Sequence, residues 1–170
     1  MKILVVYASK HGATRRIAEQ IAETLEHLGN ETVVGPVEVA DDPGAYDAVV
    51  IGSAIYYGAW RKDAVEYVHA HRAELASRPV WLFSSGPTGT SPVPDPKVLA
   101  ELRAAIGPRG HHMFAGAIDH SQLSLAERAI VKMVKAPEGD FRDWDEIVAW
   151  AKSISVALAT EAPATVGSQA

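Results

Sequence analysis

The sequence predicts one doubly wound α/β domain, in which helices cover both faces of a parallel sheet. Four short and nearly continuous apolar runs indicate strands that are buried on both faces. These runs are Ile3–Ala8, Ala48–Gly52, Val80–Phe83 and Met113–Ile118. Helical patterns separate the runs, and strands that alternate with helices at this spacing are typical of βαβ units with right-handed crossovers.

The other elements follow from hydrophobic periodicity. Ala13–Leu28 predicts a helix, because its apolar residues recur at intervals of three and four. Glu31–Val39 predicts a weaker strand, and Gly35-Pro36 within it indicates an edge position because proline donates no ladder hydrogen bond. Two more helical patterns cover Lys62–Ala76 and begin again near Asp143.

Composition and charge set the class of protein. With 170 residues, 48% of them apolar and 22% charged, we expect one globular domain over residues 1–158. Residues 159–170 lack a hydrophobic period and predict a disordered tail. The chain contains no cysteine, so redox chemistry requires a bound cofactor. The formal charge of -5 argues against nucleic-acid binding.

The predicted location is cytoplasmic, with one segment suited to a membrane surface. Met1-Lys2 leads directly into an apolar strand without the sections of a secretory signal. Ser124–Lys135, as a helix, has an apolar face beside a face carrying Arg128, Lys132 and Lys135. Such a helix can lie on the anionic inner face of a membrane. The alternative is that its apolar face packs against the protein's own sheet.

Ligands of open α/β sheets bind beyond the carboxyl ends of the strands, where the strand order reverses. The first loop at this edge contains Ser9, Lys10, His11, Gly12, Ala13 and Thr14. A helix start follows, and its unpaired N–H groups favour an anion, as do Arg15 and Arg16, which otherwise oppose the helix dipole. Neither nucleotide-loop motif matches, so a monophosphate site is predicted. The alternative is a helix cap at Ser9 or His11.

Two further loops leave the same edge. The second contains Ser53, Ala54, Ile55, Tyr56, Tyr57 and Gly58. Its aromatic surfaces suit a planar heterocycle, although ordinary core aromatics would give the same pattern. The third contains Ser84, Ser85, Gly86, Pro87, Thr88 and Gly89. Its hydroxyl and amide groups suit the other side of the same ligand, or else form a solvated loop.

These segments resemble flavodoxin-fold proteins, and in particular the flavodoxin-type protoporphyrinogen dehydrogenases that use menaquinone. The resemblance covers most of the chain and rests on residues 7–14, 50–58, 114–118, 132–135 and 143–144. It implies a five-stranded parallel sheet of order 2-1-3-4-5 that binds FMN. The first loop would bind the phosphate, with the second and third loops on either side of the isoalloxazine ring. The chain departs from ordinary flavodoxins at His11, where they usually have a hydroxyl residue, and in the third loop, which lacks a stacking aromatic.

Charge near the loops separates a flavin enzyme from an electron carrier. Residues 9–16, 53–63 and 84–97 hold six cationic and two acidic side chains, an excess of four on a chain of charge -5. Flavodoxin-type carriers resemble one another in acidic flavin surroundings, which repel the anionic reduced flavin, whereas basic surroundings stabilise it. We therefore expect an FMN-dependent oxidoreductase whose partner is a quinone, a porphyrinogen or a redox protein. A flavodoxin-type carrier and a scaffold without flavin are the alternatives.

Other residue patterns predict no further chemistry. The seven histidines include His69, His71 and the pair His111-His112, but no cysteine or carboxylate completes a metal site. No residue is assigned an acid–base role, because the cofactor carries the electron transfer. Tyr56, Tyr57 and His11 are candidates for indirect roles.

Overall fold

The structure, a computed structural model, describes residues 1–56, 58–86, 95–118, 124–133 and 138–161. Five parallel strands form the central sheet in the order β2-β1-β3-β5-β6, and the short β4 pairs antiparallel with β3. The strands are β1 (Lys2–Ala8), β2 (Glu31–Pro36), β3 (Ala48–Tyr56), β4 (Ala59–Trp60), β5 (Val80–Ser85) and β6 (Gly110–Phe114). The predicted doubly wound fold and its strand order are confirmed.

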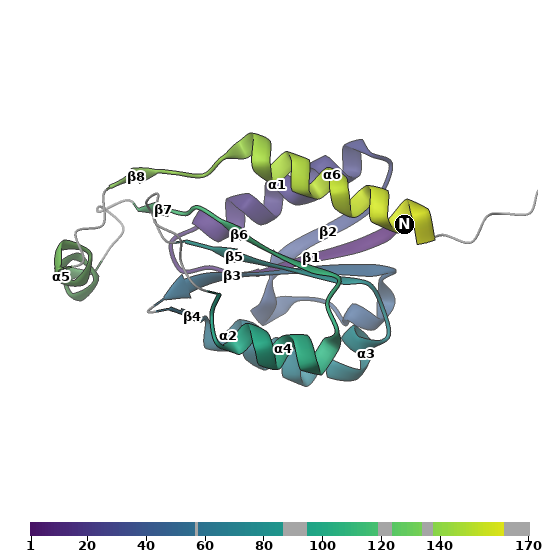
Figure 1. Ribbon diagram of the computed structural model, residues 1–170, viewed down its shortest axis with the longest axis horizontal. Helices are drawn as coiled ribbons and strands as arrows, with labels where there is room; N and C mark the ends of the chain where they lie inside the picture. The colour runs from purple at the N-terminus through teal and green to yellow at the C-terminus, as the bar shows by residue number, and fades with distance from the viewer. Residues whose placement is uncertain (57, 87–94, 119–123, 134–137, 162–170) are drawn as a thin grey trace, which may run out of the picture.

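Helices cover both faces of the sheet (Figure 1). One face carries α1 (Ala13–His27) and α6 (Trp144–Glu161), and the other carries α2 (Lys62–Ala70), α3 (Arg72–Ala76) and α4 (Val98–Ile106). Two 3-10 helices lie at Val37–Val39 and Pro43–Ala45. The carboxyl ends of the strands point to the left of Figure 1, where β7 (Ala117–Ile118), α5 (Leu125–Met133) and β8 (Gly139–Asp140) lie.

Each central strand contributes side chains to two buried cores. In β1, Leu4 and Val6 face the core under α2, α3 and α4, whereas Ile3 and Val5 face the core under α1 and α6. All four are at most 1% exposed. Successive side chains of a strand point to opposite faces of the sheet, and here both faces are buried. The sequence therefore shows a continuous apolar run instead of alternating apolar and polar residues.

The strand expected at Glu31–Val39 is too long by its last three residues. β2 ends at Pro36, and Val37–Val39 forms a 3-10 helix. The ladder stops where Pro36 pairs with Tyr7, because proline has no N–H to continue it. Among the described strands, β2 pairs with β1 alone, so its predicted edge position is confirmed.

Three other element predictions need correction. The strand expected at Met113–Ile118 is two strands, β6 and β7, separated at Gly116, where an added Cβ would lie 3.0 Å from the Cα of Gly86. The helix expected at Lys62–Ala76 is interrupted at His71 (φ -110°, ψ 28°). The helix α4 is missing from the prediction, although Leu99, Leu102 and Ile106 form its buried stripe.

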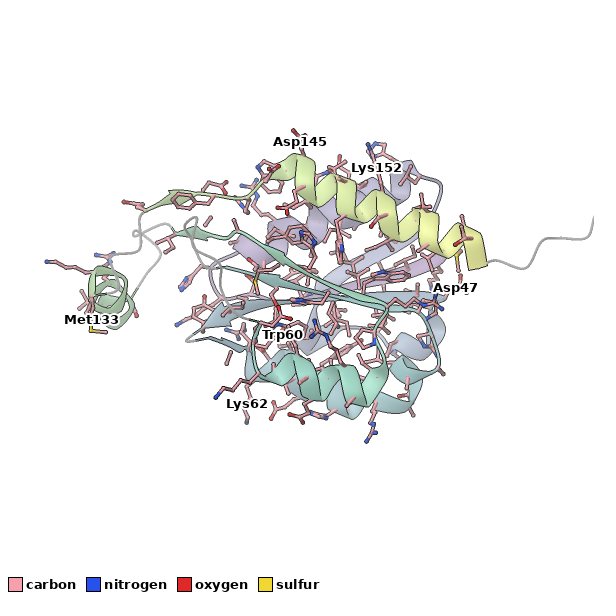
Figure 2. The ribbon with its side chains drawn as sticks, in the orientation of Figure 1. Asp47, Trp60, Lys62, Met133, Asp145 and Lys152 are labelled. Carbon is pink, nitrogen blue, oxygen red and sulfur yellow. The ribbon has the colours of Figure 1, made fainter. Side chains whose placement is uncertain are left out.

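The helix predicted within Ser124–Lys135 is confirmed as α5, which lies apart from the sheet and its helical layers (Figures 1 and 2). Leu125 is 84% and Met133 is 75% exposed, so the alternative of packing against the sheet is wrong for these side chains. The described helices include none with the length and hydropathy of a membrane span.

The helix α6 continues to Glu161, and residues 162–170 of the predicted tail lie outside the described residues.

Candidate functional site

The first loop turns from β1 into α1 at Gly12. Gly12 has a left-handed backbone (φ 81°, ψ -8°), which glycine adopts without the steric cost of a Cβ. Its N–H donates to Ser9 Oγ over 3.1 Å, which holds the turn closed. Gly12 is also the N-cap residue of α1, so the cap position offers no side chain, and the first turn of α1 contains no acidic residue. The helix start therefore keeps its capacity to bind an anion.

Thr14 lies in the first turn of α1 with its side chain buried. It is 1% exposed, and its Oγ1 is one of two buried side-chain oxygens without a hydrogen-bond partner among the described residues. The other is the hydroxyl of Tyr67. A buried hydroxyl without a partner costs about 1–3 kcal/mol. An anion at this helix start would satisfy both the hydroxyl and the first-turn N–H groups.

The second predicted loop is a tight hairpin rather than an irregular loop. β3 continues as far as Tyr56, and the chain returns along β4 after Gly58, whose φ is 76°. The ring of Tyr56 lies 6.3 Å from the ring of His11, centroid to centroid, so the first and second loops meet. Tyr57 lies outside the described residues.

The third predicted loop begins within β5. Ser84 and Ser85 are the last residues of this strand, and Gly86 follows with φ 106°. The register places Ala8, Ser53 and Ser84 in adjacent positions on β1, β3 and β5, so the three loops leave the same edge of the sheet, as predicted. The remaining residues of this loop, Pro87, Thr88 and Gly89, lie outside the described residues.

The buried hydroxyls of the second and third loops bind other parts of the protein. Ser53 Oγ accepts from the Arg61 N–H over 2.9 Å, at the point where the hairpin returns. Ser84 Oγ accepts from Trp60 Nε1 over 2.7 Å and lies 2.8 Å from His111 Nε2. Both serines are 0% exposed. Contact of these two loops with a cofactor stays a prediction, and their backbone rather than these hydroxyls would have to make it.

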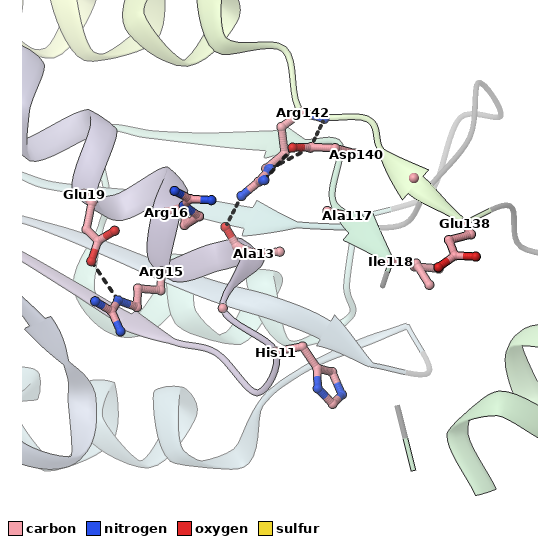
Figure 3. Close-up of a pocket in the computed structure, with 12 residues that line it drawn as sticks. His11, Ala13, Arg15, Arg16, Glu19, Ala117, Ile118, Glu138, Asp140 and Arg142 are labelled. Carbon is pink, nitrogen blue, oxygen red and sulfur yellow. Dashed lines mark hydrogen bonds and ion pairs between the residues drawn. The ribbon is translucent and has the colours of Figure 1, made fainter. Parts of the chain in front are cut away.

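A cavity of about 760 Å³ adjoins the first loop (Figure 3). Its lining comprises His11, Gly12, Ala13, Arg15, Arg16, Glu19, Ala117, Ile118, Glu138, Gly139, Asp140 and Arg142. Arg142 joins the two walls, because it pairs with Asp140 of β8 and donates to the Ala13 carbonyl of α1 over 3.4 Å. These hydrogen bonds from Arg142 hold the pKa of Asp140 below its usual range. The cavity adjoins the loop that is predicted to bind the phosphate, and binding of the phosphate and of the ring both stay predictions.

The basic excess around the loops is smaller in the structure than in the sequence count. Arg15 pairs with Glu19 at 2.7 Å, and Lys62 pairs with Glu66 at 3.0 Å. Glu19 and Glu66 lie outside the counted segments, and so does Arg103, which pairs with the counted Asp95 at 3.0 Å. Including all three partners lowers the excess from four to three. Charge therefore supports stabilisation of an anionic flavin less strongly than the sequence indicates.

Sequence reasoning did not identify Arg142 or His111 as parts of this edge, and it placed Asp95 there only as a charge near the third loop. Asp140 and Arg142 carry a local signal, since opposite charges two residues apart precede a helix. His111 carries none, because its partners Ser84 and Asp95 lie far from it in the chain.

Comparisons with known proteins agree with the fold. A family model described as a flavodoxin domain matches residues 4–145. Protoporphyrinogen IX dehydrogenase (quinone) of Escherichia coli strain K12 is 26% identical, over 91% of this chain and 95% of that protein. The protein of the same name from Leishmania major is 27% identical, over 86% of this chain and 68% of that protein. A flavodoxin from the domain Archaea shares the fold, with a TM-score of 0.65 and 17% identity over 94% of this chain and 99% of that chain.

Proposed function

This chain belongs to the flavodoxin-domain family, and we propose that it is an FMN-dependent oxidoreductase that transfers electrons between a porphyrinogen and a quinone. The observation that carries the cofactor assignment is the buried hydroxyl of Thr14, unpartnered among the described residues, in the first turn of α1. Family membership implies a flavin, and FMN is the flavin that ends in a phosphate monoester. Such a phosphate would satisfy Thr14 Oγ1 and the N–H groups beside it.

The residues present fit this cofactor. Ser9–Thr14 would hold the phosphate through backbone N–H groups and the Thr14 hydroxyl. Ser53–Gly58 and Ser84–Gly89 would contact the ring from its two sides, held at their spacing by the hydrogen bonds of Ser53 and Ser84. When bound, FMN supplies the electron transfer, and no side chain is assigned a proton-transfer step.

An enzyme is favoured over an electron carrier by the relatives. The Escherichia coli dehydrogenase matches this chain over nearly the whole length of both proteins, and its name gives a porphyrinogen and a quinone as its reactants. The remaining basic excess of three near the loops supports the same choice. The carrier is the second candidate, and the pairing of Arg15 and Lys62 with acids favours it.

Two buried threonines of α1 provide a matched test of the phosphate site. Thr14 lacks a partner among the described residues, whereas Thr24 Oγ1 donates to the Gln20 carbonyl over 2.8 Å. Thr14→Val should weaken FMN binding by about 10- to 100-fold, the usual value of a hydrogen bond to a charged group. Thr24→Val should leave it unchanged. Quenching of flavin fluorescence measures both affinities, and equal affinities would contradict this placement of the phosphate.

Anaerobic turnover tests the proposed reaction. FMN-loaded protein is mixed with protoporphyrinogen IX, with and without menaquinone, and porphyrin fluorescence is followed. We expect porphyrin to form with repeated turnover when the quinone is present. Rapid exchange with a ferredoxin-type protein, no turnover with quinone, and a strongly negative potential for the second electron would instead identify a carrier. Failure of the protein to bind FMN would identify the scaffold.

The exposed helix α5 is the surface that we assign to the membrane. Leu125 and Met133 offer apolar contacts, and the neighbouring Arg128 and Lys132 are also exposed and suit anionic headgroups. Each such cation contributes about 1 kcal/mol near an anionic surface. A peripheral position at the inner face of the membrane, on a cytoplasmic protein, would give the flavin access to a membrane quinone.

Liposome sedimentation tests this surface. Arg128→Glu combined with Lys132→Glu should abolish binding to anionic vesicles, because it replaces attraction to the headgroups by repulsion. Lys152→Glu, a charge reversal on the exposed face of α6, is the control and should leave binding intact. If the wild-type protein does not bind anionic vesicles, α5 has another role.

A further inference from the structure

A chain of polar contacts lies beside the second and third loops, on the face of the sheet that carries α2 and α4; it is buried from Trp60 to His111 and ends at the half-exposed Asp95. We call it the His111 chain; it consists of Trp60, Ser84, His111 and Asp95. Trp60 Nε1 donates to Ser84 Oγ over 2.7 Å, and Ser84 Oγ lies 2.8 Å from His111 Nε2. His111 Nδ1 lies 3.7 Å from Asp95 Oδ1, and Asp95 Oδ2 accepts from Arg103 over 3.0 Å. Ser84 is 0%, Trp60 is 5% and the His111 side chain is 4% exposed.

The donors and acceptors along this chain set its direction. An indole N–H can only donate, so Ser84 Oγ accepts from Trp60. The hydroxyl proton of Ser84 then needs an acceptor, which His111 Nε2 supplies when the imidazole is neutral. The proton of the neutral ring lies on Nδ1, which faces Asp95.

The His111 chain joins the ends of both loops. Trp60 is the last residue of β4, where the second loop returns, and it lies between the sheet and the helices α2 and α4 (Figure 2). Ser84 is the first residue of the third loop and lies within β5. Asp95 is the first described residue after that loop. Breaking the chain at His111 would therefore release constraints on both loops together.

We propose that His111 is a positioning residue that holds Trp60 and Ser84, which flank the second and third loops, in their flavin-binding arrangement while its imidazole is neutral. This inference rests on the proposed FMN site. Protonation turns Nε2 into a donor, which the second lone pair of Ser84 Oγ can accept, but the Ser84 hydroxyl proton then loses its acceptor. A buried hydroxyl proton without an acceptor is unfavourable and weakens the chain. The protein then loses affinity for FMN as His111 takes up a proton.

The groups that face His111 keep it neutral at neutral pH. Burial is the largest effect and lowers the pKa of His111, and Arg103 of α4 and His112 of β6 lower it further. Asp95 acts in the opposite direction. Ser84 of β5 and Trp60 of β4 carry no charge. The transition therefore lies on the acid side of the ordinary histidine pKa of 6.5.

A non-titrating substitution tests the inference. His111→Gln can place an amide oxygen near the Nε2 position, where it accepts from Ser84 at every pH. His69→Gln, at an exposed histidine of α2, is the matched control. The dissociation constant of FMN is measured from pH 7.5 to pH 5.0 for the wild type and both variants. The FMN phosphate itself takes up a proton near a pH of about 6, so the comparison between proteins at each pH is decisive.

We expect the wild type and His69→Gln to lose on the order of tenfold more affinity than His111→Gln over this range, which corresponds to one pKa unit of linkage. Parallel pH profiles for all three proteins would overturn the inference. Absence of FMN binding at pH 7.5 would instead contradict the proposed function and leave the His111 chain to be tested in the apoprotein.

The apoprotein test uses the indole N–H resonance of Trp60, identified by its loss in Trp60→Phe. This resonance should shift with the same midpoint as the His111 ring signals in the wild type, because Ser84 links the two groups. In Ser84→Ala the coupling should disappear. This measurement needs no flavin and remains decisive if His111→Gln does not fold. A Trp60 resonance that stays constant while His111 titrates would overturn the inference.

Discussion

Thr14 and Ser84 are both buried hydroxyl residues at the carboxyl edge of the sheet, but within the described part of the chain only Ser84 has hydrogen-bond partners. Ser84 Oγ has Trp60 and His111 as partners, whereas Thr14 Oγ1 has none among the described residues. Ser53, beside Ser84 in the register, also has its partners within the protein.

The presence or absence of a hydrogen-bond partner distinguishes two kinds of buried hydroxyl residue that cannot be told apart in the sequence. A buried hydroxyl with protein partners fixes the conformation of the loop to which it belongs. Its removal therefore lowers the free energy of unfolding. A buried hydroxyl without a protein partner lowers the free energy of unfolding. It contributes favourably only when a ligand binds and supplies the missing hydrogen bond, so its removal lowers the affinity for that ligand. Substitutions in the two groups should therefore affect different measurements.

The largest effect is expected next to the satisfied serines. Gly52→Ala would place a methyl group 1.9 Å from Phe83 Cζ, in the residue just before Ser53. Such overpacking should lower the free energy of unfolding by about 3 kcal/mol, measured by urea denaturation. Gly35→Ala in β2, where nothing lies within 4 Å of the added Cβ, is the control and should change it little. Similar urea midpoints for both variants would show that the packing around Gly52 and Phe83 relaxes to accept the added methyl group.

Ser84→Ala should have the next largest effect. The substitution removes the hydroxyl that the indole N–H of Trp60 and the Nε2 of His111 share, so both buried groups lose a hydrogen-bond partner. We expect a loss of about 2 kcal/mol in the free energy of unfolding. Ser153→Ala, at an exposed serine of α6, should cost far less. An equal loss in the free energy of unfolding for both variants would show that the buried hydrogen bonds of Ser84 stabilise the fold no more than an exposed serine does.

The pH dependence of folding provides a smaller effect. The pKa of His111 is lowered in the folded protein, so the unfolded chain binds the proton more readily. The stability is therefore fully present above the unfolded value of 6.5 and falls as the pH drops toward the folded pKa, by at most about 1.4 kcal/mol per pH unit. Thermal or urea unfolding between pH 7 and pH 5 should show a steeper fall for the wild type than for His111→Gln.

The smallest effect on folding is expected at Thr14. Thr14→Val removes a buried hydroxyl that lacks a partner among the described residues, so the apoprotein should be unchanged or more stable by about 1 kcal/mol. Thr24→Val removes a satisfied hydroxyl and should instead cost about 1 kcal/mol. A loss of stability in Thr14→Val without flavin would show that this hydroxyl serves the fold.

Much of the fold could be predicted from local pattern. The central strands and α1 were recognisable because burial on two faces, or on one helical stripe, repeats at a fixed spacing. β6 was misplaced because His111 and His112 make an edge strand look polar, although both side chains find partners in Ser84 and Glu146. The helix α4 was missed despite its regular apolar spacing.

The sequence by itself determined the sheet order through the family resemblance, and it located the helix start after Gly12, where we propose that an anion binds. The tertiary structure decided which hydroxyls are satisfied, because a hydrogen-bond partner depends on residues that folding brings together. Ser84 meets Trp60 across 24 positions of the chain and His111 across 27. No local pattern carries that information, so Thr14 and Ser84 could be distinguished only in the folded protein.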